Sequence, residues 1–262
     1  MRHVLSRNVR HPHNLVALCK TIASSSLVLG LAACGGGGSG GNSAAVNTAS
    51  ITTYNFATPQ VNSQRTYTKT IIDNSNNTVI ETIQDTITTV NPDLSFVVSE
   101  SDPSNNTYIV GGTNYSVPHG TITRNNSGQE ISASLSVSGG SATTCTFSPH
   151  GTGPNYPVSV GQTWSISFTE TCGAAAPISF IQTGSVVNVE QVIVPAGTFT
   201  ALKLQSTLSW TDSNGTTHTE SITNWRDVNN GFSVKQNISF SYGGTAQING
   251  HPVTTSIVLQ SL

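Results

Sequence analysis

Charged residues are scarce in this sequence: Asp, Glu, Lys and Arg make up 8% of its 262 residues, against about 25% in an ordinary soluble protein. A domain that binds nucleic acid carries clustered Lys and Arg, so this scarcity disfavours a nucleic-acid partner. Hydrophobic residues reach only 35%, too few for a protein that crosses a membrane several times. Ser, Thr and Asn instead fill roughly a third of the chain, far above average usage. Such a composition is typical of a polar, β-rich exported protein.

The N-terminal segment 1–33 has the features of an export signal. It contains four basic residues: Arg2, Arg7, Arg10 and Lys20. Thirteen residues without charge follow, from Thr21 to Ala33. This run suits the apolar region of a signal peptide and is shorter than the roughly 20 apolar residues of a membrane-spanning helix. We therefore predict that residues 1–33 are a signal peptide.

The residues that follow this run resemble the lipobox of bacterial lipoproteins: Leu31-Ala32-Ala33-Cys34. The resemblance implies that the Cys34 sulfur receives diacylglycerol, that the chain is cut before Cys34, and that the new amine is acylated, for example with palmitate. Two or three acyl chains hold a protein on a membrane far better than one. The alternative is an ordinary signal peptide in which Cys34 is incidental.

The segment 34–50 predicts a disordered, glycine-rich tether behind this anchor. Residues 35–41 read Gly-Gly-Gly-Gly-Ser-Gly-Gly, and Gly/Ser-rich linkers are flexible. Gly35 stands where an Asp would favour retention in the inner membrane of Gram-negative bacteria, so the lipoprotein resemblance implies a cell-envelope protein anchored in the outer membrane, facing the periplasm or the surface. Loss of the leader leaves six basic against twelve acidic residues, a weakly acidic protein.

Two of the four cysteines remain for other roles. Cys19 lies in the leader and Cys34 is the lipidation site, which leaves Cys145 and Cys172. An exported chain enters a compartment that permits disulfides, and a bridge here would stabilise the fold by about 3 kcal/mol. Two buried thiols or part of a metal site are the alternatives. Zinc sites usually contain close pairs such as C-x₂-C, which this chain lacks, so we predict a disulfide, no metal and no cofactor.

Beyond the tether, the segment 51–262 predicts one all-β domain. Apolar and polar residues alternate with period 2 over residues 131–137, 163–169, 202–210 and 232–242, as in strands with one buried face. Turn residues such as Asn-Gly separate these runs. About a dozen strands at this spacing indicate an antiparallel barrel, half-barrel or sandwich.

The run 78–90 is ambiguous by pattern alone. Val79, Ile83 and Ile87 stand four residues apart, and Glu81 and Asp85 lie between them on the same strand face. An edge strand and an amphipathic turn of helix both fit. The five Thr residues in the run favour a strand.

The C-terminal half carries a second resemblance, between Val158 and Tyr242. Its elements are V-S-V-G-Q-T-W at 158–164, V-P-A-G-T-F-T-A-L-K at 194–203, Trp225, and G-F-S-V-K at 231–235. The series resembles a pattern of uncharacterised bacterial exported β-proteins, some of which are likened to the half-open barrels of lipoprotein-localisation factors. Arg226 replaces the usual aromatic after Trp225, and one extra residue precedes the V-K pair.

That resemblance implies an apolar ligand held in a cleft lined by aromatic side chains. The candidates for the lining are Trp164, Phe168, Trp210 and Trp225. The alternative is that these large side chains anchor the packing of the core.

Motifs of catalysis are missing. No H-E-x-x-H or P-loop occurs, and a G-x-S-x-G-like string lies only in the glycine tether. The histidines after the leader are His119, His150, His218 and His251. Three acidic residues of the better-patterned half are expected at solvated strand ends: Glu170, Glu190 and Asp227. We therefore predict no catalytic residue and no enzyme.

The sequence leads to three functional hypotheses. The first is an outer-membrane lipoprotein of uncharacterised role that acts as a non-catalytic structural or interaction module, bound to the membrane by its anchor and with unknown protein partners. The second is a carrier or chaperone that holds a lipid or other apolar ligand in a half-open barrel. The third is an envelope hydrolase, which needs a His, an acid and a hydroxyl within hydrogen-bonding reach.

Overall fold

The structure is a computed structural model that describes residues 52–101, 107–110, 113–116, 119–136, 141–212, 215–243 and 252–262. The predicted signal peptide, the lipidation site Cys34, the tether and His251 lie outside the described residues. Within the described ranges every regular element is a strand. No helix there is long and apolar enough to cross a membrane.

The described residues form sixteen strands. They are β1 (Thr53–Tyr54), β2 (Gln64–Asp73), β3 (Thr78–Val90), β4 (Phe96–Ser101), β5 (Thr107–Val110), β6 (Thr113–Ser116), β7 (His119–Arg124), β8 (Glu130–Ser136), β9 (Thr143–Ser148), β10 (Val158–Ser159), β11 (Thr163–Cys172), β12 (Ile178–Val194), β13 (Gly197–Thr211), β14 (Thr217–Asp227), β15 (Ser233–Tyr242) and β16 (Pro252–Ser261).

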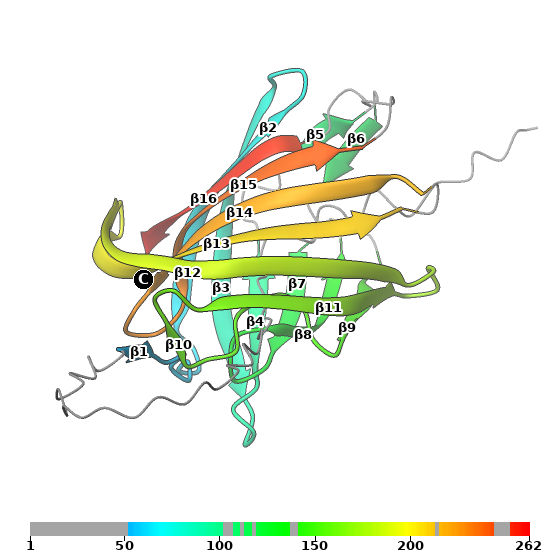
Figure 1. The fold of residues 1–262 in the computed structure, drawn as a ribbon. Coiled ribbons are helices and arrows are strands. Elements are labelled where there is room, and N and C mark those ends of the chain that lie inside the picture. The colour runs from blue at the N-terminus through cyan, green and yellow to red at the C-terminus, as the bar shows by residue number, and fades with distance from the viewer. Residues whose placement is uncertain are drawn as a thin grey trace, which may run out of the picture.

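Twelve of these strands close into an antiparallel barrel (Figure 1). The order is β11-β12-β13-β14-β15-β16-β2-β3-β4-β7-β8-β9, and β9 pairs with β11 to complete the circle. Two-stranded sheets, β1–β10 and β5–β6, lie outside this circle. The all-β prediction is confirmed, and of the three predicted architectures the structure has the closed barrel.

The ambiguous run 78–90 is a strand, β3, as expected. Up to the bulge after Ile87, its odd-numbered side chains face the barrel interior, so Ile83 and Ile87 are buried and Glu81 is buried beside them. Because side chains alternate across a strand, the apolar spacing of four and the intervening carboxylates belong to one inward face.

The barrel interior is packed mainly by separate apolar clusters. One cluster joins Phe168, Phe180, Leu208, Trp210, Ile222 and Ile238. A second joins Val158, Trp164, Val186, Leu202 and Leu204, with Tyr54 of β1 packed against it. Charged residues are buried at interior positions between the clusters. Much of the small number of charges in the chain therefore lies inside the barrel.

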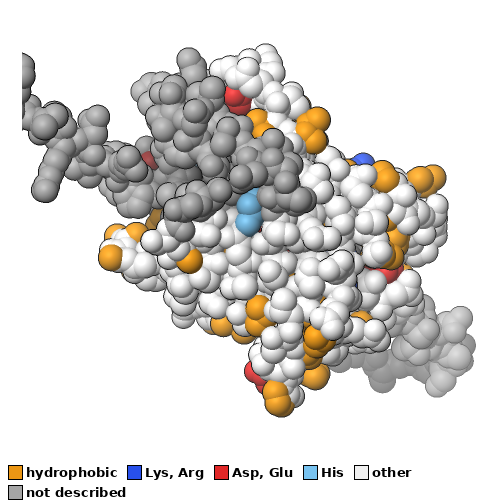
Figure 2. Space-filling view, turned by 180° about the vertical axis from the view of Figure 1, so that it is seen from behind, with side chains coloured by type: hydrophobic (Ala, Val, Ile, Leu, Met, Phe, Trp, Pro, Cys, Tyr) orange, Lys and Arg blue, Asp and Glu red, His pale blue; other side chains and the backbone are white. Residues whose placement is uncertain are grey.

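The outer face of the barrel is correspondingly rich in uncharged polar side chains. One row runs in register across six neighbouring strands, β11 to β16: Ser165, Thr183, Thr207, Ser221, Ser239 and Thr254. On the opposite side of the molecule, Figure 2 shows a face on which hydrophobic and charged side chains are scattered singly. Hydroxyl groups, rather than charged groups, therefore make the outer surface of the barrel hydrophilic.

The hairpin formed by β12 and β13 extends past one end of the barrel. Its strands are 17 and 15 residues long, and its turn is Pro195-Ala196 between paired Val194 and Gly197. The extended part curls at the left of Figure 1, beside the C-terminus. There the Ala196 amide donates to the carbonyl of Leu259 in β16, at 3.4 Å. We call residues 192–199 the hairpin tip.

Candidate functional site

The four aromatic residues predicted to line a ligand cleft do not meet in the structure. Phe168 and Trp210 belong to one interior cluster, in which Phe180 lies between them with centroid distances of 5.1 and 5.8 Å. Trp164 belongs to another cluster. Trp225 lies on the outer face, between Lys203 and Lys235 of the neighbouring strands. Three of the four therefore pack the core, and the fourth, Trp225, is apart from them on the outer face.

A small cavity of about 40 Å³ lies inside the barrel, with residues of β2, β3, β4, β7, β15 and β16 in its lining. A buried water needs about 10–15 Å³ on this measure, so the cavity has room for about three or four waters. Pockets for drug-sized ligands measure about 300–1,000 Å³. This cavity is therefore far too small for an acyl chain.

Charged side chains from neighbouring strands converge on this cavity. Strand register places Arg65 opposite Asp85, and Asp85 opposite Glu100. The Arg65 guanidinium stacks on the ring of Phe232, 3.4 Å from its centroid. Because Arg65, Asp85 and Glu100 occupy alternate, inward positions of their strands, the barrel brings them together without any loop.

Two further pairs extend the charged group. Arg124 Nη2 lies 3.2 Å from Glu130 Oε1, and His119 Nδ1 lies 3.2 Å from Glu100 Oε1. We call Arg65, Asp85, Glu100, Arg124 and Glu130 the interior charge cluster. Sequence reasoning missed it, although the alternation of charged and apolar residues in β2 and β3 was a usable signal.

Burial dominates the electrostatics of this cluster. It raises the pKa of Asp85 to about 7, helped by the Glu100 carboxylate and opposed by the guanidinium groups of Arg124 and Arg65. It also raises the pKa of Glu130 to about 7, against the pull of Arg124. Asp85 Oδ1 is buried and has no hydrogen-bond partner among the described residues. The carboxyls of Asp85 and Glu130 thus titrate near neutral pH, and that of Asp85 does so in the lining of the small cavity.

A second buried ion pair joins β2 and β3. Lys69 Nζ lies 3.2 Å from Glu81 Oε2, and the two side chains are 4% and 0% exposed. The residues are direct cross-strand partners. Burying two charges is costly unless they are paired, so this contact ties the register of β2 to that of β3.

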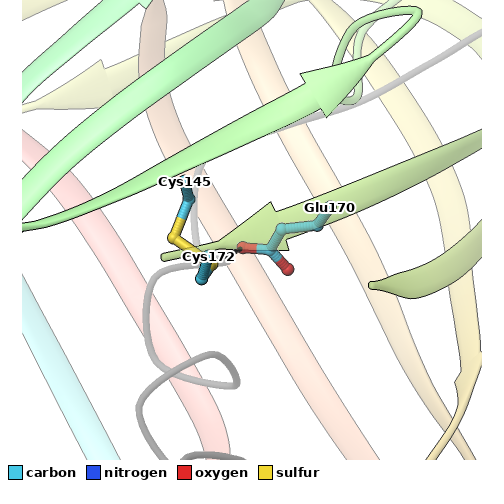
Figure 3. Close-up of side chains that lie close together, drawn as sticks. All are labelled: Cys145, Glu170 and Cys172. Atoms are coloured by element: carbon cyan, nitrogen blue, oxygen red, sulfur yellow. Dashed lines mark hydrogen bonds between the residues drawn. A yellow bond between two sulfur atoms is a disulfide. The ribbon is translucent and has the colours of Figure 1, made fainter. Parts of the chain in front are cut away.

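The two remaining cysteines form a disulfide where the barrel closes (Figure 3). Cys145 of β9 and Cys172 of β11 are direct cross-strand partners. Glu170 Oε1 lies 3.5 Å from the Cys172 sulfur; since that sulfur is bonded to Cys145 it has no proton to donate, and the approach is a van der Waals contact. The same bond removes both thiolates as ligands of a metal.

Two of the acidic residues expected at solvated strand ends are buried, so that expectation is wrong for them. Glu170 is 2% and Asp227 5% exposed. Glu170 lies inside the barrel because β11 pairs with β9 at this point. Asp227 is buried at the end of β14, where its carboxylate accepts hydrogen bonds from Asn229 and Asn230.

The described histidines lie on separate parts of the barrel. His119 is on β7 beside Glu100, and His150 follows β9. His218 of β14 places Nε2 3.1 Å from Asp212 Oδ2 and stacks on Trp210. Its Nδ1 is buried without a hydrogen-bond partner among the described residues, so no hydroxyl completes a nucleophile and base there.

The described residues thus define a closed, twelve-stranded antiparallel β-barrel protein with a packed interior. No family model and no curated protein matches the sequence. Two solved structures are similar in fold. A candidate exported protein with a YmcC-like fold from Bacteroides fragilis is 12% identical, with a TM-score of 0.47 over 80% of this chain and 99% of that one. A candidate lipoprotein from Parabacteroides distasonis is 14% identical, with a TM-score of 0.48 over 80% and 98%.

Proposed function

We propose that this protein is an exported lipoprotein, held on the outer membrane through Cys34, whose barrel is a non-catalytic structural or interaction module. The anchor rests on the lipobox-like Leu31-Ala32-Ala33-Cys34 and on the Gly/Ser run behind it. A folded domain on such a linker keeps its own orientation and reaches its partners near the membrane.

The observation that supports a non-catalytic structural or interaction module is the packed interior. The cavity inside the barrel measures about 40 Å³, about a tenth of what a lipid ligand needs. Interior charges contact each other, as in Lys69–Glu81 and Arg124–Glu130. A cavity of this size leaves contacts with other molecules to the outer surface and the ends of the barrel, and we do not propose the carrier.

Metabolic labelling with radioactive palmitate tests the anchor. The expected result is a labelled wild-type chain and complete loss of label in Cys34→Ala. Cys19→Ala is the matched control, because it removes a thiol from the predicted leader and leaves the lipobox intact. Label that persists in Cys34→Ala, or that disappears in Cys19→Ala alone, rejects the assignment. Separation of inner and outer membranes on a density gradient then tests the location.

A further inference from the structure

Three side chains with metal-binding atoms meet where the barrel closes (Figure 3). The sulfur atoms of Cys145 and Cys172 and a carboxylate oxygen of Glu170 all lie within 4.8 Å of one another. The three residues are 6%, 9% and 2% exposed. The spacing of the two cysteines in the sequence is not that of a usual zinc site, but the sheet makes them neighbours in space.

The pairing of β9 with β11 places these three residues. Cys145 is the direct cross-strand partner of Cys172, and three more residue pairs continue the register between the same two strands. Glu170 precedes Cys172 by two residues in β11, so the two side chains point to the same face. Because the backbone pairing fixes the positions of all three residues, we expect them to stay together when the disulfide is reduced.

The observed spacing suits a tetrahedral zinc ion. Zn–S bonds measure about 2.3 Å and Zn–O bonds about 2.0–2.2 Å, which places a sulfur and an oxygen ligand about 3.6 Å apart. Glu170 Oε1 lies 3.5 Å from the Cys172 sulfur. Two thiolates on one zinc ion lie about 3.8 Å apart by the same geometry, so the two sulfurs must separate by side-chain rotation once their bond is broken.

The charge of the barrel interior favours a cation at this place. Among the described residues, six acidic side chains are buried against three basic ones. Glu130 lies near enough to Glu170 that, after burial itself, the neighbouring carboxylates of Glu100 and Glu170 raise its pKa. Burying charges of one sign is costly, and a divalent cation bound to Glu170 offsets part of this negative charge.

The set of donor atoms favours zinc among the common metals. Calcium and magnesium ions take oxygen ligands, and copper(I) selects sulfur ligands. Zinc accepts thiolate and carboxylate together, and with three protein ligands it binds a water molecule at the fourth position.

We propose that Cys145, Cys172 and Glu170 bind Zn²⁺ when the disulfide is reduced. A protein dithiol reduces the bridge: its own two thiols become a disulfide, and the sulfurs of Cys145 and Cys172 gain two electrons and two protons. Zn²⁺ then displaces the two thiol protons, which pass to solvent. The closing pair β9–β11 is thus linked in both states, by a covalent bond when oxidised and by a metal ion when reduced. The site does not depend on the lipid anchor.

Titration of the reduced chain with Co²⁺ tests the site. The chain carries Cys19→Ser and Cys34→Ser, which leaves Cys145 and Cys172 as its cysteines. A phosphine reduces the disulfide and becomes a phosphine oxide, and the excess is removed by gel filtration without oxygen. Co²⁺ replaces Zn²⁺ in tetrahedral sites and absorbs in the near ultraviolet through charge transfer from thiolates. Zn²⁺ is then added in competition.

The expected result is one equivalent of bound Co²⁺ with a charge-transfer band, which one equivalent of Zn²⁺ abolishes. The oxidised chain shows no band. Glu170→Gln keeps the band and lowers the Zn²⁺ affinity by at least about tenfold, since even changes outside the ligand set lower metal affinity by about 10- to 100-fold. Glu220→Gln is the matched control: Glu220 is 0% exposed, lies on β14, and is outside the group of three, so its substitution leaves the affinity unchanged.

Three results overturn the proposal: a reduced chain that binds no Co²⁺, a band that persists when both cysteines are replaced by Ser, or equal Zn²⁺ affinity in wild type and Glu170→Gln. The last would make Glu170 a packing residue beside the bridge. Circular dichroism before metal addition checks that each reduced chain is folded. If Glu170→Gln unfolds, Cys145→Ser replaces it, with an expected band of half the intensity; an undiminished band rejects the site. Palmitate labelling and metal binding are independent results.

Discussion

The raised pKa of Glu130 predicts a specific dependence of stability on pH. Glu130 is 5% exposed, and its pKa in the folded barrel is about 7 against an ordinary value of 4.5. Below pH 4.5 the carboxyl is protonated in both states and its titration has no effect on stability. Between pH 4.5 and 7 the unfolded chain loses the proton while the folded chain keeps it, so the free energy of unfolding falls as pH rises.

The magnitude follows from the size of the shift. One pKa unit corresponds to about 1.4 kcal/mol, so Glu130 lowers the free energy of unfolding by about 3 kcal/mol above pH 7 relative to pH 4.5. Glu130→Gln keeps the shape and removes the titration. We therefore expect this variant to gain about 3 kcal/mol relative to wild type between pH 4.5 and 8, or about 10 °C in melting temperature.

Urea unfolding at pH 4.5, 6 and 8, followed by tryptophan fluorescence, measures this difference. The prediction concerns how the difference in unfolding free energy between wild type and variant changes with pH. Any cost of the substitution that does not depend on pH therefore cancels. Asp93→Asn is the control: hydrogen bonds from Ser95 lower the pKa of the Asp93 carboxyl, so it is ionised over this range. A difference in unfolding free energy between wild type and Glu130→Gln that stays constant from pH 4.5 to 8 would refute the reasoning.

Three further results are expected. Lys69→Met removes the 3.2 Å partner of the buried Glu81 carboxylate and should lower the free energy of unfolding by about 3–5 kcal/mol. The double variant Lys69→Met/Glu81→Leu should recover most of that loss. Denaturant titration distinguishes the two variants, and equal losses of stability contradict the ion pair. Replacing Cys145 and Cys172 by Ser opens a loop with a sequence separation of 27 and should cost about 3 kcal/mol, visible as a lower urea midpoint; an unchanged midpoint contradicts it. A fluorescent fatty acid should show no saturable binding, since the 40 Å³ cavity cannot hold it, and a micromolar dissociation constant would revive the carrier.

Individual strands were well predicted from local pattern. Alternation over residues 163–169 and 202–210 corresponds to β11 and β13, because period 2 follows from strand geometry and needs no tertiary information. The choice of a strand over a helix for residues 78–90 followed from its Thr content and is confirmed by β3.

The candidate site was poorly predicted because it depends on which face of each strand points into the barrel and on which strands pair to close it. Trp164 and Trp225 both lie in strands with alternating pattern, yet one is in the core and the other on the outer face. The neighbours of Trp225 along the chain, Asn224 and Arg226, are polar but buried. Their burial depends on partners from other strands.

The sequence by itself determined where strands run and how little charge the chain has to distribute, and it predicts the anchor at Cys34. Only the tertiary structure decided that the sheet closes through β9 and β11 and that Asp85 and Glu130 share an interior with Arg65 and Arg124. The physical reason is that alternation assigns side chains to two faces. Which face is sheltered from water depends on strand pairs far apart in the chain.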